Sequence, residues 1–163
     1  MPTQLYRRDL PHILPDLRPT FVTFSTRKRF ELSPEARKLA LECCLHDHDR
    51  KAFIHAAVVM PDHVHLVLSR MLNPANSEAF TLEEIMQGIK GASAHAINKL
   101  LRRRGHIWQD ESFDNYLRTG EALNDKLRYV VSNPVRAGLA QKAREYPWLW
   151  TADPRLFERL AIP

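Results

Sequence analysis

Residues Val58 to Ser69 read VVMPDHVHLVLS, and this stretch decides much of the expected fold. Two strand-like runs, AFIHAAVVM and HVHLVLS, are separated only by Pro61 and Asp62. So short a connection, with a proline in it, suits two antiparallel neighbours. We therefore predict a β-hairpin here.

The two histidines of this stretch share one face of the second strand. Side chains alternate between the two faces of a strand, so His63 and His65 point the same way. The opposite face carries Val64, Leu66 and Leu68, which should pack beneath helices. The histidine face is mixed in polarity, and we expect it to be left open.

Flanking segments supply further strands and helices. Alternating apolar residues predict a first strand within 19–30, and residues 107–118 also look extended. Ser33 and Thr119 are candidate helix N-caps, and a third helix start has Thr81 and Glu84 in a capping box. Gly105 is the expected end of that helix.

The last predicted helix begins at Thr119 and meets Pro134, which disfavours helical geometry at Asn133. The order is then strand, helix, strand, strand, helix, strand and C-terminal helix. This order predicts an α+β fold, a ferredoxin-like antiparallel sheet with two helices on one face. We expect one domain over 1–163, with a core at 19–140, an N-terminal arm at 1–18 and a C-terminal tail at 141–163.

Composition fits a globular protein, with 44% hydrophobic and 26% charged residues in 163. No apolar run is long enough to span a bilayer, and the N-terminus lacks the apolar segment of a signal peptide. We therefore expect a cytoplasmic protein without a membrane partner.

The charge balance favours an anionic partner. The net charge is +5, the sequence pI is about 9.5, and positive residues cluster at Arg102–Arg104 and in the N-terminal quarter, which includes Arg7 and Arg8. Such clusters are also common on solvated faces, so charge alone does not decide for nucleic acid.

His63 and His65 suggest a metal site. At i and i+2 their Cα atoms should lie about 6–7 Å apart, within reach of one ion. Zinc would need further strong ligands that the sequence does not supply nearby, whereas Mg²⁺ or Mn²⁺ accepts oxygen donors and water. The alternative is two polar side chains on a solvated face.

A nucleophile for phosphate chemistry is sought among four tyrosines. Tyr129 has Asn133 four residues later and Lys126 three residues earlier, on one helical face. Tyr116, in the extended segment, is a rival. Two purely structural roles remain possible: Tyr129 as a core or rim residue, and Asn133 as the N-cap of a following short helix.

Several motifs together resemble one family. MPDHVHLVL looks like the histidine–hydrophobic–histidine motif of the single-tyrosine transposases. PTFVTFSTR, IWQDESFDNYLR and LRYVVSNPVRAGL are similar in order and spacing to the REP-associated tyrosine transposases, over roughly residues 5 to 150. The chain departs from that pattern at Asn115 and Tyr116, where relatives often carry histidine or arginine.

The resemblance implies a nuclease core that cleaves and rejoins single-stranded DNA at hairpins formed by palindromic repeats. It implies that His63 and His65 hold the divalent metal, Mg²⁺ or Mn²⁺, and that Asn133 completes the site. Tyr129 becomes the nucleophile and forms a 5′-phosphotyrosine.

DNA-contacting residues are expected among the cations, and the protein is expected to be a monomer or homodimer. The expected set is Arg7, Arg8, Arg102, Arg103, Arg104, Arg118, Lys126 and Arg136. The sequence leaves two other functions open: a domesticated hairpin-binding protein that no longer cleaves, and a different metalloenzyme on the same fold. Few carboxylates near the histidine pair disfavour the latter.

Overall fold

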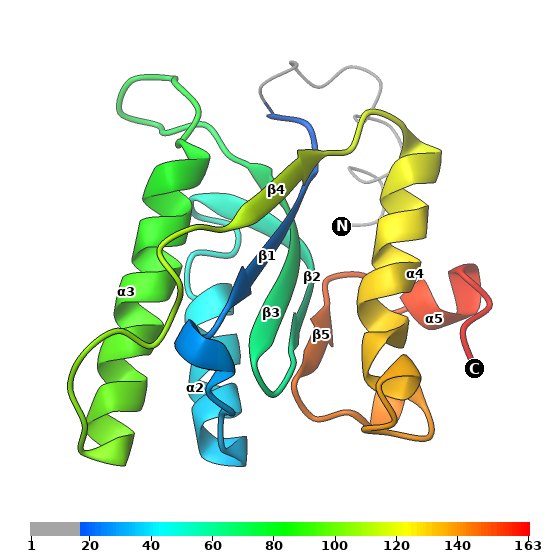
Figure 1. The fold of residues 1–163 in the computed structure, drawn as a ribbon. Helices are drawn as coiled ribbons and strands as arrows, with labels where there is room; N and C mark the ends of the chain where they lie inside the picture. Colours follow the sequence, from blue (N-terminus) through cyan, green and yellow to red (C-terminus); the bar gives the residue numbers. More distant parts are fainter. Residues whose placement is uncertain (1–16) are drawn as a thin grey trace.

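A five-stranded antiparallel sheet in the order β4-β1-β3-β2-β5 forms the centre of the computed structural model, which describes residues 17–163 (Figure 1). The predicted α+β fold is confirmed. The strands are β1 (Thr20–Ser25), β2 (Ala52–Val59), β3 (His63–Arg70), β4 (Phe113–Tyr116) and β5 (Leu149–Thr151). The helices are α2 (Pro34–Leu45), α3 (Leu82–Leu101), α4 (Gly120–Arg136) and α5 (Leu156–Arg159), with short 3₁₀ turns η2 (Arg27–Arg29) and η3 (Ala143–Glu145).

Helix starts follow the predicted caps. The hydroxyls of Ser33, Thr81 and Thr119 each accept a backbone N–H three residues later, and Glu84 completes the capping box of α3. These bonds satisfy N–H groups that have no partner within the helix. Across the described residues, 17–163, no helix is both long and apolar enough to cross a membrane.

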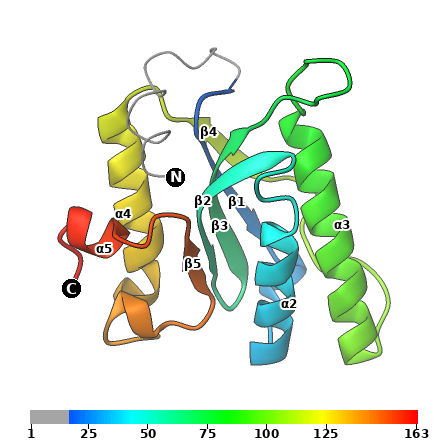
Figure 2. The same ribbon diagram turned by 180° about the vertical axis from the view of Figure 1, so that it is seen from behind.

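One face of the sheet packs on α2 and α3, as the alternation of β3 predicts (Figure 2). Val64, Leu66 and Leu68 are fully buried and share a core with residues of both helices. Val22 and Phe24 of β1 lie in the same core. The main hydrophobic core therefore lies between this face of the sheet and the helices α2 and α3.

The other face is not open, and that expectation is wrong. Helix α4 lies across it, so the sheet is sandwiched between α2 and α3 on one side and α4 on the other (Figure 1). Phe21 and Val67 pack there against the apolar stripe of α4, and His65 is only 5% exposed. The stripe consists of Leu123, Leu127, Val130 and Val131. Burial of this stripe removes it from water, which favours docking of the helix.

Helix α4 also continues through Pro134 to Arg136, against the predicted break at Asn133. Proline lies in the last turn, where it forfeits only one helical hydrogen bond, and its ring is buried. The helix ends instead at Arg136, with Ala137 as C-cap, and Gly138 follows with a left-handed φ of 73°. Leu139 N–H donates to the Pro134 carbonyl across this turn, a C-terminal closure that glycine favours.

Two other boundaries differ from expectation. Helix α3 stops at Leu101 rather than near Gly105, because Arg102 itself adopts the left-handed conformation with φ of 51°. Arg103 and Arg104 therefore follow the helix. The C-terminal segment, expected to be a tail, contributes β5 to the sheet beside β2.

Strand β2 contains a register irregularity between Ile54 and Ala56 that places His55 in the interior. The imidazole Nε2 of His55 lies 2.8 Å from the Ser69 hydroxyl oxygen. Burial, with a smaller contribution from His48, lowers the pKa of His55 from 6.5 to about 3.

This shift predicts acid sensitivity of the fold. As the pH falls below 6.5, the unfolded chain binds a proton at His55 that the folded chain refuses, so stability is lost towards pH 3. The slope reaches about 1.4 kcal/mol per pH unit, or about 2 kcal/mol between pH 6.5 and 5. Urea unfolding of His55→Gln should show a smaller loss between those pH values. The exposed His95→Gln is the control, and an equal loss in all three proteins would contradict the prediction.

Candidate active site

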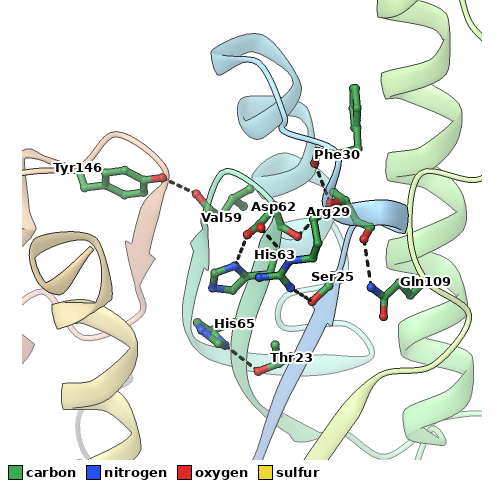
Figure 3. A network of polar contacts seen from close by, with 11 residues as sticks. Thr23, Ser25, Arg29, Phe30, Val59, Asp62, His63, His65, Gln109 and Tyr146 are labelled. Atoms are coloured by element: carbon green, nitrogen blue, oxygen red, sulfur yellow. Dashed lines mark hydrogen bonds and ion pairs between the residues drawn. The ribbon is translucent and has the colours of Figure 1, made fainter. Parts of the chain in front are cut away.

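The start of β3 brings His63 and His65 together on the face covered by α4. Their ring centroids are 4.7 Å apart and inclined at 73°. His65 is buried, whereas the His63 side chain keeps 21% of its exposure. Figure 3 shows the two rings one above the other beside β1.

Asp62 fixes the orientation of His63. The Nδ1–H of His63 donates to Oδ1 of Asp62 at 2.7 Å, which leaves its Nε2 available as a ligand (Figure 3). Arg29 binds the other oxygen of Asp62 through Nε at 2.9 Å and donates to the Ser25 hydroxyl at 3.2 Å. A carboxylate behind a histidine in this way orients the ring and makes it a better metal ligand.

Arg29 belongs to the η2 turn, whose backbone is strained. Lys28 and Arg29 have φ of 53° and 55°, a left-handed conformation that costs non-glycine residues about 1–3 kcal/mol each. The turn is held to the hairpin by Thr26, whose N–H donates to the Asp62 carbonyl at 2.8 Å. Its hydroxyl is shared between the carbonyls of Phe30, at 2.7 Å, and Asp62, at 3.1 Å. Neither Asp62 nor Arg29 was among the expected site residues.

His65 is held by a different partner. Its Nδ1 lies 2.7 Å from the Thr23 hydroxyl oxygen, and its buried Nε2 has no hydrogen-bond partner. Burial, with smaller contributions from His63 and Lys126, lowers the pKa of His65 to about 3. This shift favours the neutral ring, and in the tautomer whose Nδ1–H donates to Thr23 the ring presents a bare, buried Nε2.

Tyr129 of α4 is brought against this pair. Its ring centroid is 5.4 Å from that of His65 and 6.0 Å from that of Phe21. Two cations flank the phenol ring, with Lys126 Nζ at 5.3 Å and the Arg136 guanidinium carbon at 5.2 Å from the centroid. Histidine pair, tyrosine and cations, predicted from separate stretches, thus meet at one place.

Comparisons with known proteins show the family to which the chain belongs. The family model of IS200-like transposases matches residues 18–132, well over half of the chain. This chain belongs to the IS200-like transposase family.

Two relatives of this IS200-like chain bear on the predicted resemblance, which they confirm. The REP-associated tyrosine transposase of Haemophilus influenzae is 25% identical over 97 residues, 57% of this chain. The chain spans only 55% of that curated relative's length. The solved structure of a REP-associated tyrosine transposase bound to a REP hairpin has a TM-score of 0.66 at 21% identity, over 85% of this chain and 79% of that one.

The fold itself is shared more widely than the IS200-like family. A bacterial tRNA(His) guanylyltransferase-like protein in complex with GTP has a TM-score of 0.52 at 8% identity, over 83% of this chain and 73% of that one. The fold therefore does not decide the chemistry, and the side chains at the site must.

Other tyrosines of this IS200-like chain are placed differently. Tyr116 pairs with Thr20, whose side of β1 faces α2 and α3, so it lies across the sheet from His65. Tyr146 is buried and donates its hydroxyl to the Val59 carbonyl at 2.7 Å. Among residues 17–163, Tyr129 is thus the tyrosine beside the histidines. Tyr6 lies outside the described residues.

The third metal position and the DNA contacts stay predictions. Asn133 is half-buried on α4, one turn beyond Tyr129 and not an N-cap. In the described chain, no group of three or more His, Cys, Asp and Glu side chains could hold a metal. Arg118 is exposed just before α4, and Arg7 and Arg8 lie outside the described residues.

Arg102–Arg104 gather elsewhere, at the end of α3. They line an open pocket of about 530 Å³ together with His95, Asn98, Lys99 and Gly105. Arg103 also stacks over Phe30, with 4.8 Å from its guanidinium carbon to the ring centroid. This cationic hollow is separate from the histidine pair.

Proposed function

We propose that this protein is a metal-dependent transposase that cleaves and rejoins single-stranded DNA at hairpin-forming palindromic repeats. The observation that carries the proposal is the contact of Tyr129 with His65, with Lys126 and Arg136 beside the same phenol ring. A nucleophile, two imidazoles and two cations at one place suit attack on a phosphodiester.

Hairpin DNA as the substrate is supported by family and charge. The REP-associated relative in the solved structure is bound to a REP hairpin, and this chain carries a net charge of +5. Phosphates are contacted by arginine and lysine whatever the sequence, which suits the exposed Arg118 and the cluster at Arg102–Arg104.

The residues fit a divalent ion, Mg²⁺ or Mn²⁺. His63 and His65 would hold it through Nε2, the atom left free by Asp62 on one ring and orphaned in the interior on the other. Asn133 would add an oxygen, and Mg²⁺ and Mn²⁺ accept water and phosphate oxygens at their remaining positions. When bound, the ion polarises the phosphate and stabilises charge that develops in the transition state.

The reacting step belongs to Tyr129. Its oxygen attacks the scissile phosphorus in line and its proton passes to solvent, while the bond from phosphorus to the 3′ oxygen breaks. That oxygen takes up a proton and leaves as a free 3′-hydroxyl, and the phosphate stays on Tyr129 as a 5′-phosphotyrosine. Lys126 and Arg136 stabilise the negative charge on the phosphate. A 3′-hydroxyl can reverse the step, because the energy of the phosphodiester is retained.

Trapping of a covalent adduct tests this function. Wild-type protein incubated with end-labelled single-stranded hairpin DNA and Mg²⁺ or Mn²⁺ should yield a band of slower mobility on a denaturing gel. A domesticated binder would retard the same DNA on a native gel but leave no such band. Failure to form the adduct on any hairpin tested would overturn the proposed cleavage.

The arginine cluster predicts a salt effect on binding. Replacing Arg102, Arg103 and Arg104 by glutamine should flatten the slope of log affinity against log salt by about 0.7–0.9 per lost phosphate contact. If all three arginines contact phosphates, the slope should decrease by about 2–3 in total. Fluorescence anisotropy with hairpin DNA at several salt concentrations measures the slope.

A charge-matched control separates contact from net charge. Lys142, Arg144 and Arg155 are exposed and belong to the segment around η3 and the start of α5. Figure 1 shows α5 on the other side of the sheet from α3. Their triple glutamine variant removes the same charge and should leave the slope near wild type. Equal slopes in the two triple variants would show that Arg102–Arg104 are solvated surface residues that do not contact DNA.

A further inference from the structure

Strand β4 is exposed along its whole length, unlike the rest of the sheet. All four residues, Phe113 to Tyr116, are solvent-exposed, and among the described strands β4 is the one at the edge of the sheet beside β1. Phe113 is 61% exposed, which is a large apolar surface to leave in water. An exposed aromatic ring at a sheet edge is available to stack on a ligand.

The pairing register assigns each residue of β4 to a face. Phe113 is opposite Thr23 and Asn115 is opposite Phe21, and residues opposite each other share a face. Thr23 is the residue bonded to His65, so Phe113 and Asn115 lie on the side of the candidate active site. Tyr116 lies on the other side.

A line of rings connects Phe113 to the candidate nucleophile. The Phe113 ring centroid is 6.3 Å from that of Phe21, and Phe21 stacks on His65 at 5.4 Å. Lys126 Nζ is 4.4 Å from the Phe21 ring centroid and 5.3 Å from that of Tyr129. The exposed Phe113 and the cation of Lys126 thus contact the same ring, Phe21, and Lys126 also contacts the candidate nucleophile.

We propose that Phe113 and Asn115 form a platform for one unpaired nucleobase next to the scissile phosphate. Single-stranded nucleic acid is bound by combining cations for the backbone with aromatic rings for the bases, and β4 with Lys126 supplies both. The Asn115 amide is placed to pair with the base edge, and adenine is the base that this side chain pairs with best. The proposal rests on the proposed function, since it places DNA at Tyr129.

Binding assays in EDTA test the platform without cleavage. Hairpin DNA carries 2-aminopurine at successive positions of its single-stranded flank, and fluorescence quenching reports stacking. Wild type should quench at one position. Phe113→Ala should abolish that quenching and weaken binding roughly 5- to 150-fold, since stacking contributes about 1–3 kcal/mol per base. The slope against salt should not change, because no charge is lost.

Two further measurements make the result specific. Phe113→Trp should restore quenching and affinity, and an abasic nucleotide at that position should weaken wild type while leaving Phe113→Ala unaffected. Asn115→Ala should reduce a preference for adenine there. Leu139→Ala, which removes an exposed apolar side chain beyond α4, should behave as wild type.

Equal affinity of wild type and Phe113→Ala would overturn the platform. So would a loss of affinity that persists with abasic DNA. An edge strand can also pair with a second copy of the chain, so sedimentation is run in parallel. A dimer that Phe113→Ala dissociates, with quenching unchanged, would assign the surface to that contact. Adduct formation by wild type is scored separately, so failure of the platform is distinct from failure of the cleavage proposal.

Discussion

Tyr129→Phe is expected to form no covalent adduct with hairpin DNA, a loss on the order of 10³-fold or more in cleavage. The substitution removes one oxygen and keeps the ring that contacts His65 and Phe21. Fold and hairpin affinity should therefore stay near wild type. Denaturing gels measure the adduct, and anisotropy measures binding on the same DNA.

Tyr116→Phe is the matched control for this substitution. Tyr116 is across the sheet from His65 and 45% exposed, so its variant should form adduct within a few-fold of wild type. Peptide mapping of a trapped adduct identifies the labelled residue directly. Label on the peptide that holds Tyr116, with Tyr129→Phe still active, would identify Tyr116 of β4 as the nucleophile instead.

Removal of either imidazole has the second large expected effect. His63→Ala or His65→Ala should weaken Mn²⁺ binding on the order of 100-fold or more and abolish cleavage, because in the proposed site each ring would supply one ligand nitrogen. Hairpin affinity should change little, since it depends on many cations. Calorimetric titration with Mn²⁺ gives a measurement that does not depend on cleavage.

Further variants separate the loss of a metal ligand from the loss of side-chain packing at His63 and His65. His65 is buried, so its truncation also leaves a cavity, and thermal unfolding must accompany the titration. Asp62→Ala leaves both rings present but releases His63, and should weaken Mn²⁺ binding about 10- to 100-fold. The control His95→Gln should bind as wild type. Near wild-type cleavage by His63→Ala in magnesium would refute the metal assignment.

Local patterns predicted much of this molecule. The alternation of β3 placed His63 and His65 on one face and Val64, Leu66 and Leu68 on the other, and both placements are confirmed. Alternation is fixed by strand geometry, so it survives any tertiary arrangement. Helix caps are equally local, since their partners lie three residues away.

Long-range relations were not predictable in the same way. The closed second face depends on where α4 docks, although its stripe at Leu123, Leu127 and Val130 signalled a surface that needed cover. Thr23 reaches His65 only through the register between β1 and β3, 42 residues apart in sequence. Asp62 was adjacent to His63, but its bond to Arg29 depends on the strained turn.

Helix α4 runs through Pro134 without a break, and this continuity governs how strands could be exchanged. Tyr129, Asn133 and Arg136 belong to one continuous helix whose stripe is packed on the sheet. A DNA end joined to Tyr129 would be anchored to the body of the protein rather than carried on a swinging arm. The incoming 3′-hydroxyl would then have to reach the phosphotyrosine. The path of the bound DNA would therefore decide which DNA ends are joined.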